Sequence, residues 1–304
     1  PFSVFRRVNL DFNQFTSFDF ENNHNRTQYR FRPRITFLNN SKISVGITHR
    51  PRIYKNAELR GGPRWRFSEE NSESLFFNSD DRKKFNFKTG VVHSKLKENN
   101  GSFLKFELDF NYQIIDALNF TLSTEFSKRF SQTQYITQKE FLTFNRYILG
   151  SIDNQTLQST LRINYSLSPN ISIQYYAQPF ISKGKYSNFK YVTNATADLL
   201  QDRFQLYENP QIQYNNDTYS FDDNLDGTLD YSMSNPDFSL VQFNSNLVFR
   251  WEYIPGSELF LVWSQGIRTN ISLEDGLIDG YQTGILDQQP HNIFLIKFTH
   301  RFIL

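Results

Sequence analysis

Large apolar side chains occupy every second position of residues 104–112, which read LKFELDFNY. Lys105, Glu107 and Asp109 stand between them. Successive side chains of a β-strand point to opposite faces, so this stretch predicts a strand with one aromatic-rich face and one ionic face. Such a strand is stable only where both faces have suitable surroundings, with apolar atoms on one side and water or polar groups on the other.

The same alternation recurs along the whole chain. We predict about 12 strands, at residues 4–20, 27–37, 43–54, 65–78, 84–96, 102–113, 118–129, 155–167, 171–182, 239–253, 258–267 and 293–304. Many of them reach the ~9–11 residues that a tilted strand needs to cross a bilayer. Short connections such as 39–41 and 255–257 alternate with mostly long ones, such as 130–154 and the long extracellular loop 183–238. Short turns at one end and long loops at the other are typical of outer-membrane barrels.

The composition agrees with a β-rich chain. Phe occurs 32 times and Tyr 16 times, both residues that favour strands, while Met occurs once. The absence of cysteine excludes disulfides and thiolate metal sites. The net charge of +2 gives no basic field of the kind that binds nucleic acid. Hydrophobic residues make up only 38% of the chain, which would suit a soluble protein, but a barrel has polar loops and one polar face on each strand.

We therefore predict an all-β fold, an antiparallel transmembrane β-barrel with about 12 strands visible and up to 14–16 in a longer protein. Residues 1–304 would be the C-terminal portion of that protein, because the chain begins at Pro1 without a signal peptide. The alternative is a soluble β-sandwich or solenoid whose apolar faces form a core. The number and length of the strands and the asymmetry of the turns favour the barrel.

Several stretches resemble a family of Bacteroidota outer-membrane proteins of unknown function. They are Arg60-Gly61-Gly62-Pro63, Ser79-Asp80-Asp81-Arg82-Lys83, residues 147–189, residues 243–266 (FNSNLVFRWEYIPGSELFLVWSQG) and the closing Arg301-Phe302-Ile303-Leu304. The resemblance covers roughly residues 60–304. It implies a C-terminal barrel in the cell outer membrane, normally preceded by a family-9-like carbohydrate-binding module that is not among these residues. It implies lipid, lipopolysaccharide and the barrel-insertion machinery as partners, with polysaccharide or envelope proteins as further candidates, and it supplies no reaction.

One acidic loop has the spacing of a cation site. Within DDNLDGTLD (222–230), oxygen-bearing side chains alternate around a glycine, as in calcium-binding loops. The candidate ligands are Asp222, Asn224, Asp226, Thr228 and Asp230. Met233 stands where the bidentate acid of an EF-hand would be, so two interpretations remain: a Ca²⁺ site or an acidic loop that binds nothing.

Ionic residues on the polar faces of the strands would line the barrel lumen. They are Arg30, Arg32, Arg34, Lys105, Glu107, Asp109, Glu125, Arg162, Arg250, Glu252, Lys297 and Arg301. They could form a selective pore lining or an ionic network that fills the lumen and stiffens the wall. The mixed signs favour the network, because a strongly selective pore would show one sign.

The closing strand and the absence of catalytic motifs complete the prediction. Phe298, Phe302 and Leu304 form an alternating aromatic end that resembles the signal read by the barrel-insertion machinery. The five histidines are scattered, and no G-x-S-x-G or H-E-x-x-H motif occurs. We expect a membrane anchor or scaffold for carbohydrate handling or an envelope complex. The alternatives are an outer-membrane pore and an outer-membrane hydrolase with a loop-borne site.

Overall fold

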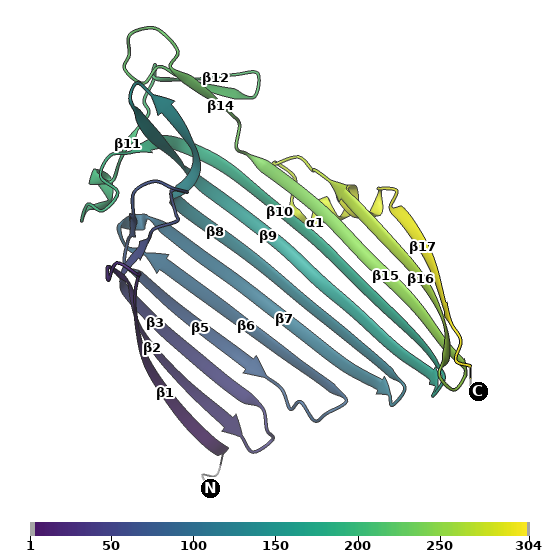
Figure 1. Ribbon diagram of the computed structural model, residues 1–304. Coiled ribbons are helices and arrows are strands. Elements are labelled where there is room, and N and C mark those ends of the chain that lie inside the picture. Colours follow the sequence, from purple (N-terminus) through teal and green to yellow (C-terminus); the bar gives the residue numbers. More distant parts are fainter. Residues whose placement is uncertain (1–3, 303–304) are drawn as a thin grey trace.

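A computed structural model describes residues 4–302 of the chain, and one large antiparallel sheet dominates it (Figure 1). Its strands follow one another in chain order. They are β1 (Phe5–Phe18), β2 (His24–Phe37), β3 (Lys42–Lys55), β5 (Glu70–Asn78), β6 (Phe85–Leu96), β7 (Gly101–Ile115), β8 (Leu118–Phe141), β9 (Phe144–Ser168), β10 (Ile171–Val192), β15 (Phe238–Ile254), β16 (Ser257–Thr269) and β17 (His291–Thr299). Each predicted strand is present, and the fourth is divided into a short β4 (Trp65–Phe67) and β5.

The two ends of the sheet differ as the sequence predicts. Short turns, such as the one at residues 255–256 between β15 and β16, lie at the lower end in Figure 1, together with the start of β1 and the end of β17. The longer connections and a small additional sheet lie at the upper end, called the loop end below. Among residues 4–302, no helix is both long enough and apolar enough to span a membrane.

The sheet is not closed into a barrel within the described residues. There β1 pairs only with β2, and β17 pairs only with β16, so each has one free edge. The predicted all-β antiparallel architecture is confirmed at the level of the sheet.

The prediction that residues 130–154 form a loop is wrong. β8 and β9 continue through it to a two-residue turn at Leu142 and Thr143. The register of this hairpin shifts twice, between Ser131 and Gln134 and between Tyr135 and Thr137. A β-bulge adds a residue to one strand and reverses the faces that follow, so the alternation in the sequence is lost although pairing continues.

The expected loop 183–238 is also more ordered than its sequence indicates. Its first ten residues extend β10 to Val192. η2 (Leu200–Asp202) and β11 (Phe204–Leu206) follow, and β11 pairs with the end of β10. A separate three-stranded sheet then forms from β12 (Ile212–Asn215), β13 (Thr218–Phe221) and β14 (Tyr231–Ser234). Strands of three or four residues are too short to show a periodicity in the sequence, so whether such segments form strands depends on their packing in the folded protein.

The closing segment ends earlier than expected. β17 stops at Thr299, and Phe302 lies beyond it with its side chain exposed. Phe298 is within β17, and Leu304 lies outside the described residues. The role of these three residues as an insertion signal stays a prediction. Before β17, the connection from β16 contains a short helical segment, α1 (Leu277–Tyr281) followed by η3 (Gln282–Leu286).

The fully buried side chains lie mainly at the loop end. One cluster joins Ile148 and Phe189 of the main sheet to Phe221 of the small sheet. A second packs Leu59 and Trp65 against Leu149. A third places α1 and η3 over Ile181 and Val241. The long strands between these clusters and the short turns are covered by no other element of residues 4–302, so their two faces decide what the sheet can contact.

Candidate functional site

The first feature of the candidate site is a continuous apolar face. Directly opposite residues on neighbouring strands share a face, and the register places Phe106 opposite Phe126 and Phe249 opposite both Ile173 and Leu261. The row continues to the sheet edge, where Leu261 faces Ile296. Phe106 is 48% exposed and Ile296 is 73% exposed, whereas Phe126 packs against the third buried cluster.

Towards the loop end, the open apolar band gives way to a covered region, because Phe126 and Phe243 on the same face pack against the third buried cluster. A polar row crosses the same face, in which Thr124 contacts Ser159 at 3.1 Å and Ser245 donates to Gln265 at 3.2 Å. Still closer to the loop end, the face carries an ion pair between Lys128 and Asp153. Sequence reasoning missed the polar row because its residues are ordinary on each strand, and only the register aligns them.

The height of the band is close to that of a bilayer core. On β7 it runs from Leu104 to Tyr112, which is about 27 Å along a strand at ~3.4 Å per residue. A tilt of about 40° reduces this to roughly 21 Å across the membrane, near the ~25 Å apolar belt of outer-membrane barrels.

Amphipathic aromatic side chains mark both borders of the band. At the short-turn border, Trp251 lies against Tyr253, and Tyr253 donates a hydrogen bond to the carbonyl oxygen of Thr299. At the polar row, Trp263 donates from Nε1 to Oδ1 of Asn292 at 2.8 Å. Rings with an apolar body and one hydrogen-bonding group favour the headgroup region of a membrane.

The opposite face of the sheet carries an ionic network on β6, β7 and β8. Glu107 lies at its centre, 2.5 Å from Lys88 Nζ and 3.0 Å from Lys105 Nζ. Lys88 also approaches Asp109 at 3.8 Å, and Lys105 reaches Glu125 at 3.3 Å. Four of the predicted lumen residues therefore meet, and their charges compensate one another.

The other predicted lumen residues fall into two groups. Arg250 pairs with Glu252 and Glu258, while Arg162 and Lys297 lie over the rings of Tyr176 and Phe260. Arg301 lies beyond β17, against the turn at Gly256. By contrast, Arg30, Arg32 and Arg34 occupy alternate positions of β2 and form no ion pair with any residue in 4–302. Arg34 donates a hydrogen bond from Nε to Ser44 Oγ at 3.3 Å. The charged side chains of β6 to β8 and of the β15–β16 pair therefore fit the interpretation as an ionic network, whereas the arginines of β2 do not.

The predicted calcium loop is held by its own hydrogen bonds. Asp222 accepts the amide protons of Asp226 and Gly227, and Asp226 accepts that of Thr228. Asn224 donates to Asp226, while Asp230 accepts the amide proton of Asp223. Among residues 4–302, no three acidic or histidine side chains gather closely enough to hold a metal ion. The hydrogen bonds from Thr228 and Asn224 lower the pKa of Asp226. The calcium site stays a prediction.

A calcium titration tests this loop directly. Since Asp222 and Asp226 must give up the hydrogen bonds that they accept from backbone amides before they can bind a cation, we expect weak binding, with a Kd of about 10⁻⁴–10⁻³ M, in the range of extracellular modules. Replacing Asp226 with Asn should weaken binding by about tenfold or more, measured by calorimetry. Replacement of the exposed Asp198, outside the loop, is the control. Equal heats from the wild type and the Asp226→Asn variant would reject the site.

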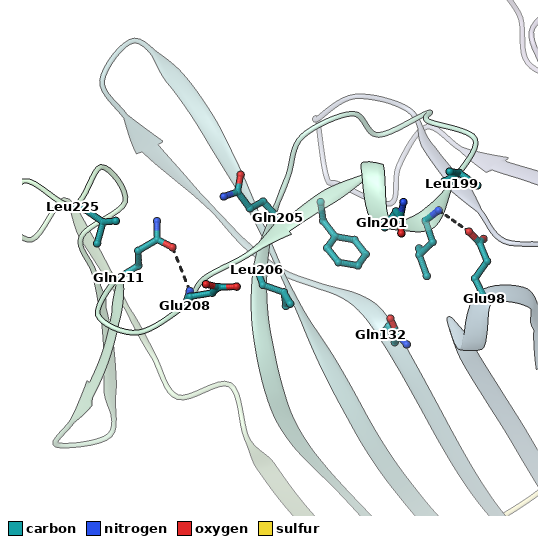
Figure 2. A pocket seen from close by; sticks show the side chains of 11 residues that line it. Glu98, Gln132, Leu199, Gln201, Gln205, Leu206, Glu208, Gln211 and Leu225 are labelled. Atoms are coloured by element: carbon teal, nitrogen blue, oxygen red, sulfur yellow. Dashed lines mark hydrogen bonds between the residues drawn. The ribbon is translucent and has the colours of Figure 1, made fainter.

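The second feature of the candidate site is a cavity of about 790 Å³ at the loop end (Figure 2). It lies between Glu98, the β8 residue Gln132 and the segment from Leu199 to Gln211. Its lining is rich in amide and carboxyl groups around Phe204 and several leucines; the polar residues are Glu98, Gln132, Gln201, Gln205, Glu208 and Gln211. Sequence reasoning missed this cavity because the segments that build it are far apart in the chain.

Two buried cations lie behind residues that line the cavity. Lys190 is 2% exposed and donates from Nζ to the carbonyl oxygen of Gln132 and to Ser151 Oγ. Burial lowers the pKa of Lys190 to about 8. Arg203, 1% exposed, donates to the carbonyl oxygens of Ala197 and Asp198. Lys190 and Arg203 therefore fix the loop backbone around the cavity.

A buried ion pair attaches the small sheet to the main sheet. Arg146 of β9 binds Asp223 through two hydrogen bonds, Nε to Oδ2 at 3.0 Å and Nη2 to Oδ1 at 2.7 Å. Tyr207 and Tyr231 also donate to Asp223 Oδ2. Burial is the main cause that raises the pKa of both tyrosines. The ring of Phe189 in β10 also lies 4.4 Å, centre to centre, from the ring of Tyr219 in β13, so the small sheet is held by charge, hydrogen bonds and aromatic contact together.

Comparison with known proteins identifies one family. A family described as a domain of unknown function, DUF5916, matches residues 1–303. A search of curated proteins found no match to the chain.

Proposed function

Starting from the membership of this chain in the DUF5916 family, we propose that it forms the wall of a β-barrel in a bacterial outer membrane and anchors a carbohydrate-handling assembly there. The observation that carries the proposal is the exposed apolar band, which is crossed by a polar row and bordered by amphipathic aromatic side chains. In water, a band of this size would be an aggregation hazard. In a bilayer it is the surface that lipid requires.

The proposal includes closure of the sheet. Lipid offers no hydrogen bonds to a strand edge, so a spanning sheet must pair the edges of β1 and β17. Further strands of a longer chain would complete the barrel, as the resemblance to Bacteroidota outer-membrane proteins implies. Lipid, lipopolysaccharide and the barrel-insertion machinery are then the expected partners.

The carbohydrate part of the proposal is supported by the loop-end cavity. Glutamine amides both donate and accept hydrogen bonds, and carboxylates accept them. Around Phe204, such groups suit a polyhydroxylated ligand, whose hydroxyls need both kinds of partner. The cavity lies at the end opposite the short turns, which is the extracellular end in barrels of this layout.

Tryptophan fluorescence tests the membrane proposal, because the three tryptophans lie in different surroundings. Trp251 and Trp263 are 42% and 37% exposed on the apolar face, whereas Trp65 is fully buried at the loop end. In vesicles containing lipids brominated along the acyl chain, we expect most of the emission of the wild type to be quenched. The double variant Trp251→Phe/Trp263→Phe, which keeps only Trp65, should be quenched little.

The double variant also serves as the control for water accessibility. Because Trp65 is fully buried, acrylamide dissolved in the water should quench its fluorescence weakly, both in vesicles and in detergent. A protein that stays monodisperse in detergent-free buffer, with Trp251 and Trp263 unquenched by brominated lipid, would contradict the membrane proposal.

A further inference from the structure

The polar face of β2 carries a row of arginines whose charge is not compensated. Arg30, Arg32 and Arg34 occupy alternate positions of this strand, and none of them forms an ion pair within residues 4–302. Asp11 lies directly opposite Arg32 on β1 but forms no ion pair with it in this part of the chain. On β6 to β8, in contrast, each lysine of the network has a carboxylate partner.

These arginines border a hollow in the polar face. Two adjoining cavities, of about 350 and 240 Å³, share Arg32, Gly46, Ser74 and Phe76 in their linings. The first also contacts Arg30, and the second contacts Arg34. Gly46 on β3 is needed for the close approach of Ser74 on β5, because a Cβ atom added to Gly46 would lie only 2.4 Å from Ser74 Oγ.

The floor of the hollow offers unused hydrogen-bond donors. The hydroxyl groups of Thr48, Ser72 and Ser74 line it and make no side-chain hydrogen bond to any described residue. A hydroxyl can donate to an anionic oxygen. Arg50, which also lines the first cavity, is already paired with Glu70 at 2.8 Å and donates to Gln28. The free positive charge is thus confined to the β2 wall.

We propose that this hollow is a binding site for a multivalent oxyanion, a solute or polymer segment bearing several phosphate or carboxylate groups. The guanidinium group is a planar fork that binds such groups through two parallel hydrogen bonds. Alternate residues of a strand lie about 6.8 Å apart, so the three arginines span roughly 13–14 Å. A ligand with two or three charged groups matches that row better than a single small anion. The site does not require that the sheet span a membrane.

Calorimetry with inorganic tripolyphosphate and with citrate, on the full chain in detergent, tests the site. We expect saturable binding of at least one of them, and the tighter ligand identifies the recognised group as phosphate or carboxylate. Binding should weaken as salt rises, because the arginines are half-exposed and their attraction is screened. The double variant Arg30→Gln/Arg32→Gln should weaken binding by about tenfold or more, the scale of losing charge-assisted hydrogen bonds.

Two further variants make the result specific. Ser74→Asp keeps every arginine and places a carboxylate in the hollow, so it should weaken binding about as strongly as the double variant. Arg250→Gln removes a charge from the same face, where Arg250 is already paired with Glu258, and should leave binding unchanged. The proposal is overturned if neither anion binds, or if the double variant binds as tightly as the wild type. It is also overturned if Arg250→Gln weakens anion binding as much as the double variant does.

Discussion

Replacing Phe249 with arginine is expected to destabilise the protein in a lipid bilayer by about 2–4 kcal/mol, the cost of a cation on the lipid face near the midplane of a barrel. Phe249 lies halfway along the apolar band on β15, between Ser245 of the polar row and Tyr253 at the turn border. The measurement is the free energy of unfolding in vesicles, from denaturant titration of intrinsic fluorescence.

The adjacent residue supplies the matched control. Val248 points to the polar face, where it lies opposite Gln174 and Val262. Val248→Arg introduces the same charge one position away, and we expect it to change the stability by less than about 1 kcal/mol, as for ordinary surface substitutions. Equal effects of the two substitutions would show that the two faces do not differ in their surroundings, and the membrane proposal would fail.

Truncation of Arg146 to alanine is expected to release the small sheet of β12 to β14 from the main sheet. Asp223 would then be left buried without its cation, and its side chain is only 2% exposed. Removing one partner of a buried ion pair costs about 3–5 kcal/mol. Limited proteolysis should cut residues 204–237 of the Arg146→Ala variant much faster than in the wild type, while the long strands remain protected.

Two controls separate this effect from general damage. Lys185→Ala breaks an ion pair with Glu274 in which both side chains are largely exposed, and such pairs contribute about 0–1 kcal/mol. The double variant Arg146→Met/Asp223→Leu removes both buried charges and should recover much of the lost protection. An unchanged cleavage rate in Arg146→Ala would show that the small sheet is held by its aromatic contacts alone.

The sequence by itself determined the long strands, their order and the chemistry of their two faces. LKFELDFNY at residues 104–112 is an example, because period-2 alternation follows from strand geometry alone. Turn residues such as Pro255-Gly256 likewise marked the short-turn end. The tight turn needs a positive φ at Gly256, which glycine adopts readily, so the residue type alone indicates the turn. Signals of this kind need no knowledge of distant residues.

Tertiary structure alone decided the rest. The bulges of β8 and β9 concealed the extension of that hairpin, and the strands of the small sheet were too short to predict. The loop-end cavity joins Glu98, Gln132 and residues 199–211, and the Arg146–Asp223 pair joins residues 77 positions apart. The sign of each charge on the polar face could be read from the chain, but whether a neighbouring charge compensates it could not. Lys105 meets Glu125, whereas Arg32 forms no ion pair within residues 4–302 although Asp11 lies opposite it, because side-chain packing, which no local pattern encodes, sets those distances.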